Sequence, residues 1–262
     1  MIEPLVIAAT AIGITLLYAS YRDIRERRVP FRTWYPMLVI AIPMAAWTYI
    51  SLIAQDFRLA SGYIILGIVF CVLFYVFAAY LHLFGGADAW ALIFITACIP
   101  LFPVEPYFGY PALAFFPLSS LVNAMLLNLA TPFGIFAMNV MKGNRAPFPY
   151  MFIGFPVEGS HIEDAFGFII EEFTEEDGHL TRRFLSVRNA IRRMVAGQRR
   201  MYTRDLKRFP EQYTRELALY RKAGMVWISY GVPFIIPITA GFITAIFMGD
   251  LLYTILTMVT GV

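Results

Sequence analysis

Residues 83–93 read LFGGADAWALI and place one carboxylate, Asp88, after two glycines and at the start of an apolar run. An ionisable side chain in such a place is costly unless something uses it. The whole chain is apolar: 59% of its 262 residues are hydrophobic, 15% are charged, and the mean hydropathy is +0.65. One soluble domain of this length could not bury so much apolar surface. The sequence therefore predicts an all-α integral membrane protein in which Asp88 has a role.

Six apolar stretches are candidates for spans, since crossing a bilayer takes roughly 20 helical residues. The first of them lacks a basic n-region and is followed by RDIRERR where a cleavage site would stand, so we expect it to stay in the mature protein. Residues 251–262 are too short to span and are expected at the outer interface. The predicted spans are Pro4–Tyr21, Trp34–Ala54, Gly62–Leu81, Ala89–Phe102, Pro111–Met141 and Met225–Phe247.

The basic residues set the predicted orientation. With the N-terminus outside, the cytoplasmic segments 22–33, 82–88 and 142–224 hold every one of the 21 Lys and Arg residues except Arg58. This distribution agrees with the positive-inside rule. The expected architecture is a six-helix transmembrane bundle in the plasma membrane. Residues 1–141 carry helices 1–5, residues 142–224 form a cytoplasmic insert, and residues 225–262 carry helix 6 and a short interfacial segment.

The insert divides into two patterns. Residues 166–187 contain short apolar runs around Asp177-Gly178, a hairpin turn signal. Residues 188–222 space apolar side chains at helical intervals between arginines. We therefore expect a small cytoplasmic α/β domain, inserted between helices 5 and 6, whose basic residues contact anionic membrane lipid rather than nucleic acid. Its acidic cluster would either attract a basic substrate or form a solvated hairpin face; the cluster comprises Glu171, Glu172, Glu175, Glu176 and Asp177.

Two aspartates come to the same predicted membrane face. Asp23, in YASYRDIRERRVPF (18–31), follows the first span, and Asp88 opens the fourth. Gly85 and Gly86 tolerate backbone angles that other residues resist, so they would allow a tight turn and leave room for a substrate. Two close carboxylates tend to share a proton, so one can take a proton from water while the other polarises a peptide carbonyl. The pair predicts peptide hydrolysis at the cytoplasmic membrane surface.

Each of these residues also has a simpler interpretation. An aspartate at a helix start is a favoured N-cap, and Asp23 lies among arginines that could pair with it at the interface. His82, one turn before Gly85, would either donate a hydrogen bond to a catalytic carboxylate or be an interface residue. His161 and His179 have no second ligand at a metal-binding spacing, so neither a metal nor a cofactor is indicated.

The prolines of the last predicted span, Pro233 and Pro237, also leave two interpretations open. Each removes a backbone donor and loosens the helix around it. Many membrane helices carry prolines as simple packing kinks. A loosened helix could instead line a substrate cleft.

Two motifs carry a family resemblance. The segment DIRERRVPF (23–31) resembles the Asp-x-Arg-x-x-x-[Ile/Val]-Pro-Asn element of prepilin peptidases, and GGAD (85–88) resembles the Gly-x-Gly-Asp signature of these intramembrane aspartyl proteases. Phe31 stands in place of the asparagine, and Ala87 in place of the second glycine, a variant similar to archaeal members. The resemblance implies that Asp23 and Asp88 are catalytic and that pilin-like or archaellin precursors lose a short basic leader peptide. The candidate site-shaping residues are Gly85, Gly86, Ala87 and His82.

The layout resembles one branch of that family. The segment between the first two predicted spans has about a dozen residues and no Cys-x-x-Cys pair, and the polar insert lies between the fifth and sixth spans, as in archaeal preflagellin peptidases. The resemblance therefore implies a protease without methyltransferase activity. The alternative is a non-enzymatic membrane transporter subunit, or a pilus or archaellum assembly scaffold. A transporter would more often place its carboxylates near the midplane and show a repeated half.

Overall fold

The computed structural model describes residues 3–80, 85–176, 179–186, 201–230 and 234–261. The chain forms two compact units, one made of Met1–Leu129 with Pro233–Val262 and the other of Ala130–Val232. Each unit has its own core of buried apolar side chains. The candidate aspartates both lie in the first unit.

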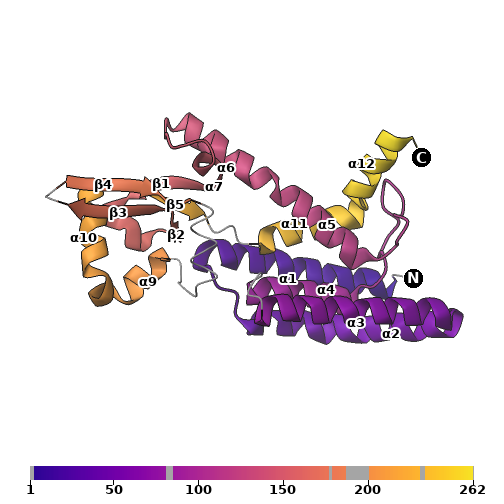
Figure 1. The fold of residues 1–262 in the computed structure, drawn as a ribbon. Helices are drawn as coiled ribbons and strands as arrows, with labels where there is room; N and C mark the ends of the chain where they lie inside the picture. The colour runs from indigo at the N-terminus through magenta and orange to yellow at the C-terminus, as the bar shows by residue number, and fades with distance from the viewer. Residues whose placement is uncertain (1–2, 81–84, 177–178, 187–200, 231–233, 262) are drawn as a thin grey trace. The chain divides into compact units, whose positions relative to one another are not determined.

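The first unit is a helical bundle in which α1, α2, α3 and α4 run alongside one another (Figure 1). The chain reverses direction between successive helices, so the end of α1 and the start of α4 lie at the same end of the bundle. The start of α11 lies there too. The helices are α1 (Pro4–Glu26), the 3₁₀ turn η1 (Phe31–Trp34), α2 (Tyr35–Gln55), α3 (Phe57–Ala79), α4 (Gly86–Cys98), α5 (Phe116–Asn128), α11 (Ile235–Phe247) and α12 (Leu251–Thr260).

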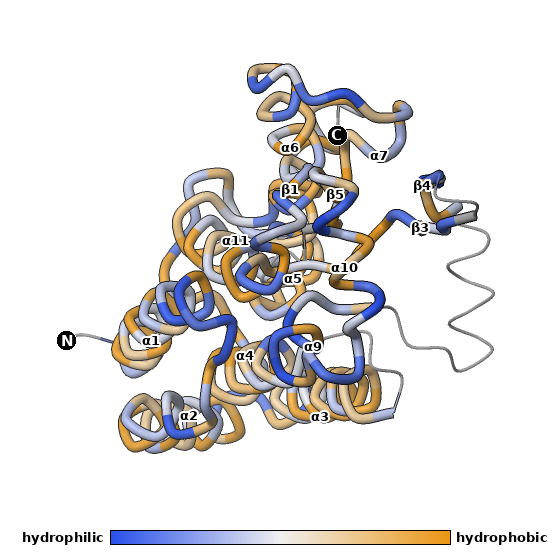
Figure 2. Tube along the Cα trace, turned by 90° about the vertical axis from the view of Figure 1, so that its left-hand side faces the viewer, coloured by the Kyte–Doolittle hydropathy of each residue, from blue (hydrophilic) through white to orange (hydrophobic). Residues whose placement is uncertain are grey.

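The described residues include four helices that are long and apolar enough to cross a membrane, or five if the bent pair α11–α12 counts as one span. The spans Phe31–Gln55 and Phe57–Ala79 have mean hydropathies of 2.0 and 2.5. Figure 2 shows α2 and α3 nearly end-on, with many hydrophobic residues in their turns. The prediction of several apolar spanning helices is therefore confirmed, but a count of six is not. The fourth predicted span, α4, has only 13 residues. It ends at Cys98 because Ile99 precedes Pro100, and a residue before proline avoids helical angles.

The prediction of one span over Met225–Phe247 is wrong for its first part. Residues Met225–Tyr230 form strand β5, and the helix begins only at Ile235. The sequence MVWISY is apolar with two β-branched residues, so hydropathy alone does not separate a buried strand from the start of a spanning helix. Strand β5 has a partner on each side, and this pairing decides its conformation.

Strand β5 is the centre of a three-stranded sheet in the second unit. It pairs antiparallel with β1 (Gly154–Glu158) and with β2 (Gly167–Ile169), giving the order β1-β5-β2. Strands β3 (Glu171–Glu176) and β4 (His179–Phe184) pair as an antiparallel hairpin, as predicted, although the turn residues 177–178 lie outside the described part. The remaining elements are α6 (Ala130–Met141), α7 (Tyr150–Ile153), η2 (Gly159–Asp164), α9 (Thr203–Arg208), η3 (Pro210–Tyr213) and α10 (Thr214–Ala223).

The acidic cluster of the insert is not one exposed face. Glu171 is buried, and its Oε2 accepts a hydrogen bond from the backbone amide of Trp227 at 2.8 Å. Glu175 forms an ion pair with Lys222. The hypothesis of a five-carboxylate steering surface is therefore wrong for Glu171, whose carboxylate attaches the hairpin to β5.

A polar junction at the end of α11 turns the chain by 57° into α12. Gly249 has a φ of +91°, which favours glycine, and Asp250 caps α12 by accepting the Tyr253 amide at 2.9 Å. The side chain of Asn123 on α5 donates to the Gly249 carbonyl at 2.7 Å and accepts the Leu251 amide at 2.9 Å. These hydrogen bonds satisfy backbone groups that lose their helical partners at the break between α11 and α12.

Helices α5 and α11 cross in close contact. A Cβ atom on Gly241 would lie 2.4 Å from the amide nitrogen of Ala124 and 2.5 Å from the carbonyl oxygen of Ser120. Both of these are backbone atoms, so neither can move aside without shifting α5. The absence of a side chain at Gly241 therefore sets the distance between the two helices.

We expect Gly241→Ala to lower the free energy of unfolding by about 1–3 kcal/mol, because overpacking forces the backbones apart. Thermal unfolding in detergent should show a Tm lower by at least about 3 °C. The matched control is Gly62→Ala on α3, where an added Cβ meets nothing within 4 Å. That variant should keep or raise the Tm, since alanine is the better helix former. Equal Tm values for the two variants would contradict the close crossing.

Glu171 provides a prediction about pH. Burial raises the pKa of its carboxyl, and the Trp227 amide and the Arg182 charge offset this only in part. Because the folded-state pKa is raised, its contribution to stability is present at low pH and is lost as the pH rises through that pKa. Glu171→Gln keeps an acceptor oxygen without the charge, so its Tm advantage over wild type should grow from about pH 5 to about pH 8. Glu158→Gln, at an exposed site, should show no such trend.

Candidate active site

Asp23 lies in the last turn of α1. The helix continues to Glu26 and ends at Arg27, whose left-handed backbone (φ 51°) lets its amide donate to the Asp23 carbonyl at 3.0 Å. The Asp23 side chain is partly buried, and the positive charge of Arg27 acts on its carboxylate. The neighbouring Arg22 forms an ion pair with Glu26 on the exposed side of the same turn. Asp23 is therefore held on a helix rather than on the loop that follows it.

Asp88 occupies the third position of α4. Its Oδ2 accepts the backbone amide of Gly85 at 3.2 Å, which is the carboxylate half of a capping box. The backbone amide of Ile235, the first residue of α11, also interacts with this carboxylate. Asp88 thus accepts an amide at the start of its own helix and lies near the start of α11, which is far away in the sequence. The prediction that Asp88 lies at a helix N-terminus is confirmed.

The two glycines before Asp88 differ in their surroundings. Gly85 has ordinary extended angles (φ −64°, ψ 146°), so it is not needed for an unusual turn. A Cβ atom on Gly85 would instead lie 2.7 Å from Asp88 Oδ2, whereas one on Gly86 would meet nothing within 4 Å. The expectation that both glycines serve a tight turn is therefore corrected: Gly85 leaves room for the carboxylate. Ala87 packs against the core of the bundle.

The structure brings the charges of Asp23 and Asp88 close enough to interact. They come from α1 and α4, which lie in the same bundle with the end of one beside the start of the other (Figure 1). His82, the other proposed site-shaping residue, lies outside the described residues. Across the described ranges, no three His, Cys, Asp or Glu side chains gather as a metal ion would require.

Aromatic contacts tie the motif of Asp23 to the helix of Asp88. Phe31, in η1, lies with its ring centroid 5.0 Å from Trp90 and 6.2 Å from Phe94, both on α4. Trp34 lies 5.8 Å from the same Phe94. Phe31, at the position of the family asparagine, therefore packs the segment after α1 against α4. The Phe31–Trp90 contact is edge-to-face, and such a contact gives the packing a preferred geometry.

Sequence reasoning missed the contribution of α11 to this site. Its first turn reaches Asp88 through the Ile235 amide, and its hydroxyl-bearing Thr239 reaches α1 at Ser20. The sequence signal was the pair of prolines, Pro233 and Pro237, which we expected either to be packing kinks in the last predicted span or to loosen it so that it lines a substrate cleft. Pro237 lies in the first turn of α11, where proline is tolerated because the amide it lacks would have no acceptor within the helix.

Comparison with known families gives two matches. The profile of the type IV leader peptidase family matches residues 10–138, and that of the archaeal peptidase A24 C-terminus, type II, matches residues 146–251. The first part of the chain is therefore similar to type IV leader peptidases, and the second part to the C-terminus of archaeal A24 peptidases. Both aspartates lie within the first of these ranges, and strands β1–β5 of the second unit lie within the second.

Curated proteins that resemble this chain include preflagellin peptidases of archaea. The protein of Methanococcus maripaludis is 25% identical over 91% of this chain and 93% of its own length. Those of Methanococcus voltae and Methanocaldococcus jannaschii are 25% and 24% identical over 95% of this chain and 98% and 97% of their own lengths. The similarity therefore extends over the whole layout, including the insert.

The two glycines provide a matched test of the site. Gly85→Ala should displace the Asp88 carboxylate and lower peptidase activity by roughly 100-fold, since a shift of about 1 Å at a reacting group has that effect. Gly86→Ala adds the same methyl group to open space and should keep activity within about threefold of wild type. The measurement is the initial rate of leader-peptide cleavage at equal protein amounts. Similar rates for the two variants would contradict the steric role of Gly85.

Proposed function

We propose that this protein is a membrane-embedded aspartyl endopeptidase that removes the short basic leader peptide from preflagellin- or prepilin-like precursors. The observation that carries the proposal is the proximity of Asp23 on α1 to Asp88 on α4. The two carboxyl groups are close enough to interact electrostatically. The match to the type IV leader peptidase profile and the similarity to preflagellin peptidases support the same activity. The non-enzymatic alternatives have no such support.

In the proposed mechanism the two carboxylates share one proton. The ionised aspartate takes a proton from a water molecule, whose oxygen attacks the scissile carbonyl carbon, while the protonated aspartate donates to the carbonyl oxygen. The tetrahedral intermediate then collapses: the C–N bond breaks, and a proton passes to the departing amine. Each aspartate therefore has to titrate, so an amide at either position blocks the cycle.

The position of the pair also suggests the form of the substrate. We propose that the precursor lies with its apolar helix in the plasma membrane and its basic leader in the cytoplasm, as the positive-inside rule favours. The scissile bond must be extended, because a helix hides its carbonyl groups from an attacking water. A glycine just before the cut would make this unwinding easier. The active site then faces the cytoplasm.

The finer architecture belongs to the same proposal. Six membrane segments place the N-terminus outside and the insert in the cytoplasm, with α4 as a short segment and α11 as the last. The insert then contacts anionic lipid headgroups rather than nucleic acid. We also propose that the enzyme has no methyltransferase activity, so that the mature product keeps a free, unmethylated N-terminal amine, which the mass of the product measures.

We expect Asp23→Asn and Asp88→Asn each to lower precursor cleavage at least 100-fold, because a proton-transferring group contributes about 10²–10⁴-fold. Asparagine keeps an acceptor oxygen for the helix cap at Asp88, so the variants should still insert and accumulate. Asp56→Asn is the matched control: Asp56 caps α3 through the amides of Arg58 and Leu59 and takes no part in the site. The measurement is the size shift of an archaellin precursor incubated with membranes that contain each variant.

The dyad would be disproved if either site variant kept more than about a few per cent of wild-type turnover, because loss of a proton-transferring group should remove nearly all of it. A parallel incubation should use a precursor whose leader lysines and arginines are replaced by neutral residues. Lower cleavage of that precursor supports a basic leader as the recognised feature, and equal cleavage of both precursors argues against it.

A further inference from the structure

A pair of hydroxyl groups joins α1 to α11 inside the bundle. The Oγ of Ser20 and the Oγ1 of Thr239 are 2.8 Å apart, and Thr239 is only 4% exposed. The Thr239 hydroxyl also lies 2.8 Å from the carbonyl oxygen of Ile235 and 3.3 Å from that of Leu16. One arrangement satisfies the two shorter contacts: Ser20 donates to Thr239, and Thr239 donates to the Ile235 carbonyl.

This pair lies one helical turn from both parts of the proposed site. Ser20 precedes Asp23 by three residues on α1, and Thr239 follows Ile235 by four on α11. Residues at these spacings share a helix face. The hydroxyl pair therefore links the turn of α1 that carries Asp23 to the turn of α11 whose first amide interacts with Asp88.

The amide of Ile235 is available to Asp88 because α11 begins at this residue. The first amides of a helix have no acceptor within it, and here the Pro237 ring removes one of them. The amide of Ile238 already donates to the Phe234 carbonyl at 3.0 Å. The Asp88 carboxylate thus accepts the Gly85 amide at the start of its own helix and lies within electrostatic range of the Ile235 amide at the start of α11.

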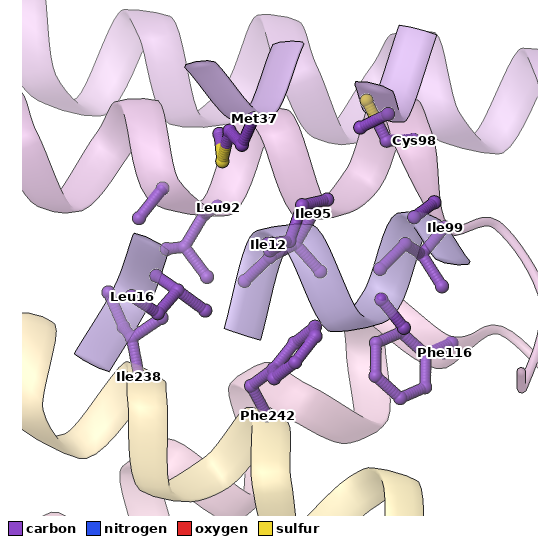
Figure 3. Packing of buried hydrophobic residues seen from close by; sticks show 14 of the residues in the cluster. Ile12, Leu16, Met37, Leu92, Ile95, Cys98, Ile99, Phe116, Ile238 and Phe242 are labelled. Atoms are coloured by element: carbon purple, nitrogen blue, oxygen red, sulfur yellow. The ribbon is translucent and has the colours of Figure 1, made fainter. Parts of the chain in front are cut away.

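Apolar packing alone does not set this alignment. Leu16 of α1, Leu92 of α4 and Ile238 of α11 point toward one another in the core (Figure 3). Such contacts hold the three helices together, but they are non-directional and tolerate small rotations. A hydrogen bond between buried side chains has a preferred distance and angle. The Ser20–Thr239 bond is therefore a directional constraint between α1 and α11.

We propose that Ser20 and Thr239 are positioning residues, which hold the first turn of α11 against α1 so that the Ile235 amide orients Asp88 toward Asp23. This inference rests on the proposed function of the two aspartates. Neither hydroxyl contacts the reacting atoms. Their loss should therefore slow the chemical step while substrate binding stays nearly unchanged.

The test compares Thr239→Val, Thr239→Ser, Ser20→Ala and the double variant Ser20→Ala/Thr239→Val as full-length protein in detergent. Thr239→Val keeps the shape of the side chain without the hydroxyl, and we expect a kcat between about tenfold and 100-fold lower, with KM within about threefold of wild type. Thr239→Ser restores the hydroxyl and should recover kcat to within about threefold. The double variant should be no slower than the slower single variant, because both changes remove the same bond.

Thr15→Val on α1 is the matched control. The Thr15 hydroxyl donates to the Ala11 carbonyl of its own helix at 3.0 Å, so its removal should leave kcat unchanged. If Thr239→Val keeps the wild-type kcat, or if Thr239→Ser does not recover the loss, the positioning role is wrong. Equal losses in Thr239→Val and Thr15→Val would also overturn it. Active Asp23→Asn and Asp88→Asn variants would instead overturn the proposed function, and the positioning role with it.

Discussion

The structure of this bundle depends on how the backbone amides at the starts of its short apolar helices find hydrogen-bond acceptors. The first amide groups of a helix have no acceptor within it, and hydrocarbon supplies none. Asp88 accepts the Gly85 amide at the start of α4 and interacts with the Ile235 amide at the start of α11. Asp250 accepts the Tyr253 amide at the start of α12. Carboxylates therefore stand at these helix starts for a structural reason before any chemistry is considered.

The same contacts prepare Asp88 for the proposed chemistry. A carboxylate held by amide groups has a defined orientation, and the missing Cβ of Gly85 leaves the space it occupies. Asp23 is carried by the last turn of a long helix, and the rings of Phe31 and Trp90 pack the following segment against α4. In the proposed site, these polar contacts would serve both the backbone and the reacting groups.

The sequence-based predictions succeeded where the signal is local. The apolar stretches of α1, α2 and α3, the hairpin around residues 177–178 and the place of Asp88 at a helix start all follow from composition, periodicity or a short motif. They failed where a distant partner decides the outcome. Residues Met225–Tyr230 look like the start of a span, yet β1 and β2 make them a strand. The sequence suggests that Glu171 is a surface acid, yet its carboxylate is buried and accepts a hydrogen bond from the Trp227 amide.

The sequence by itself determined that the chain is a membrane protein, that two aspartates flank apolar segments, and that their motifs resemble those of leader peptidases. Hydropathy, charge and motif spacing are properties of neighbouring residues, so no fold is needed to recognise them. The tertiary structure decided which backbone amides meet Asp88, how closely α5 and α11 approach, and that Ser20 faces Thr239. Apart from the Gly85 amide, these contacts join residues more than a hundred positions apart, and only the packing of whole helices brings them together.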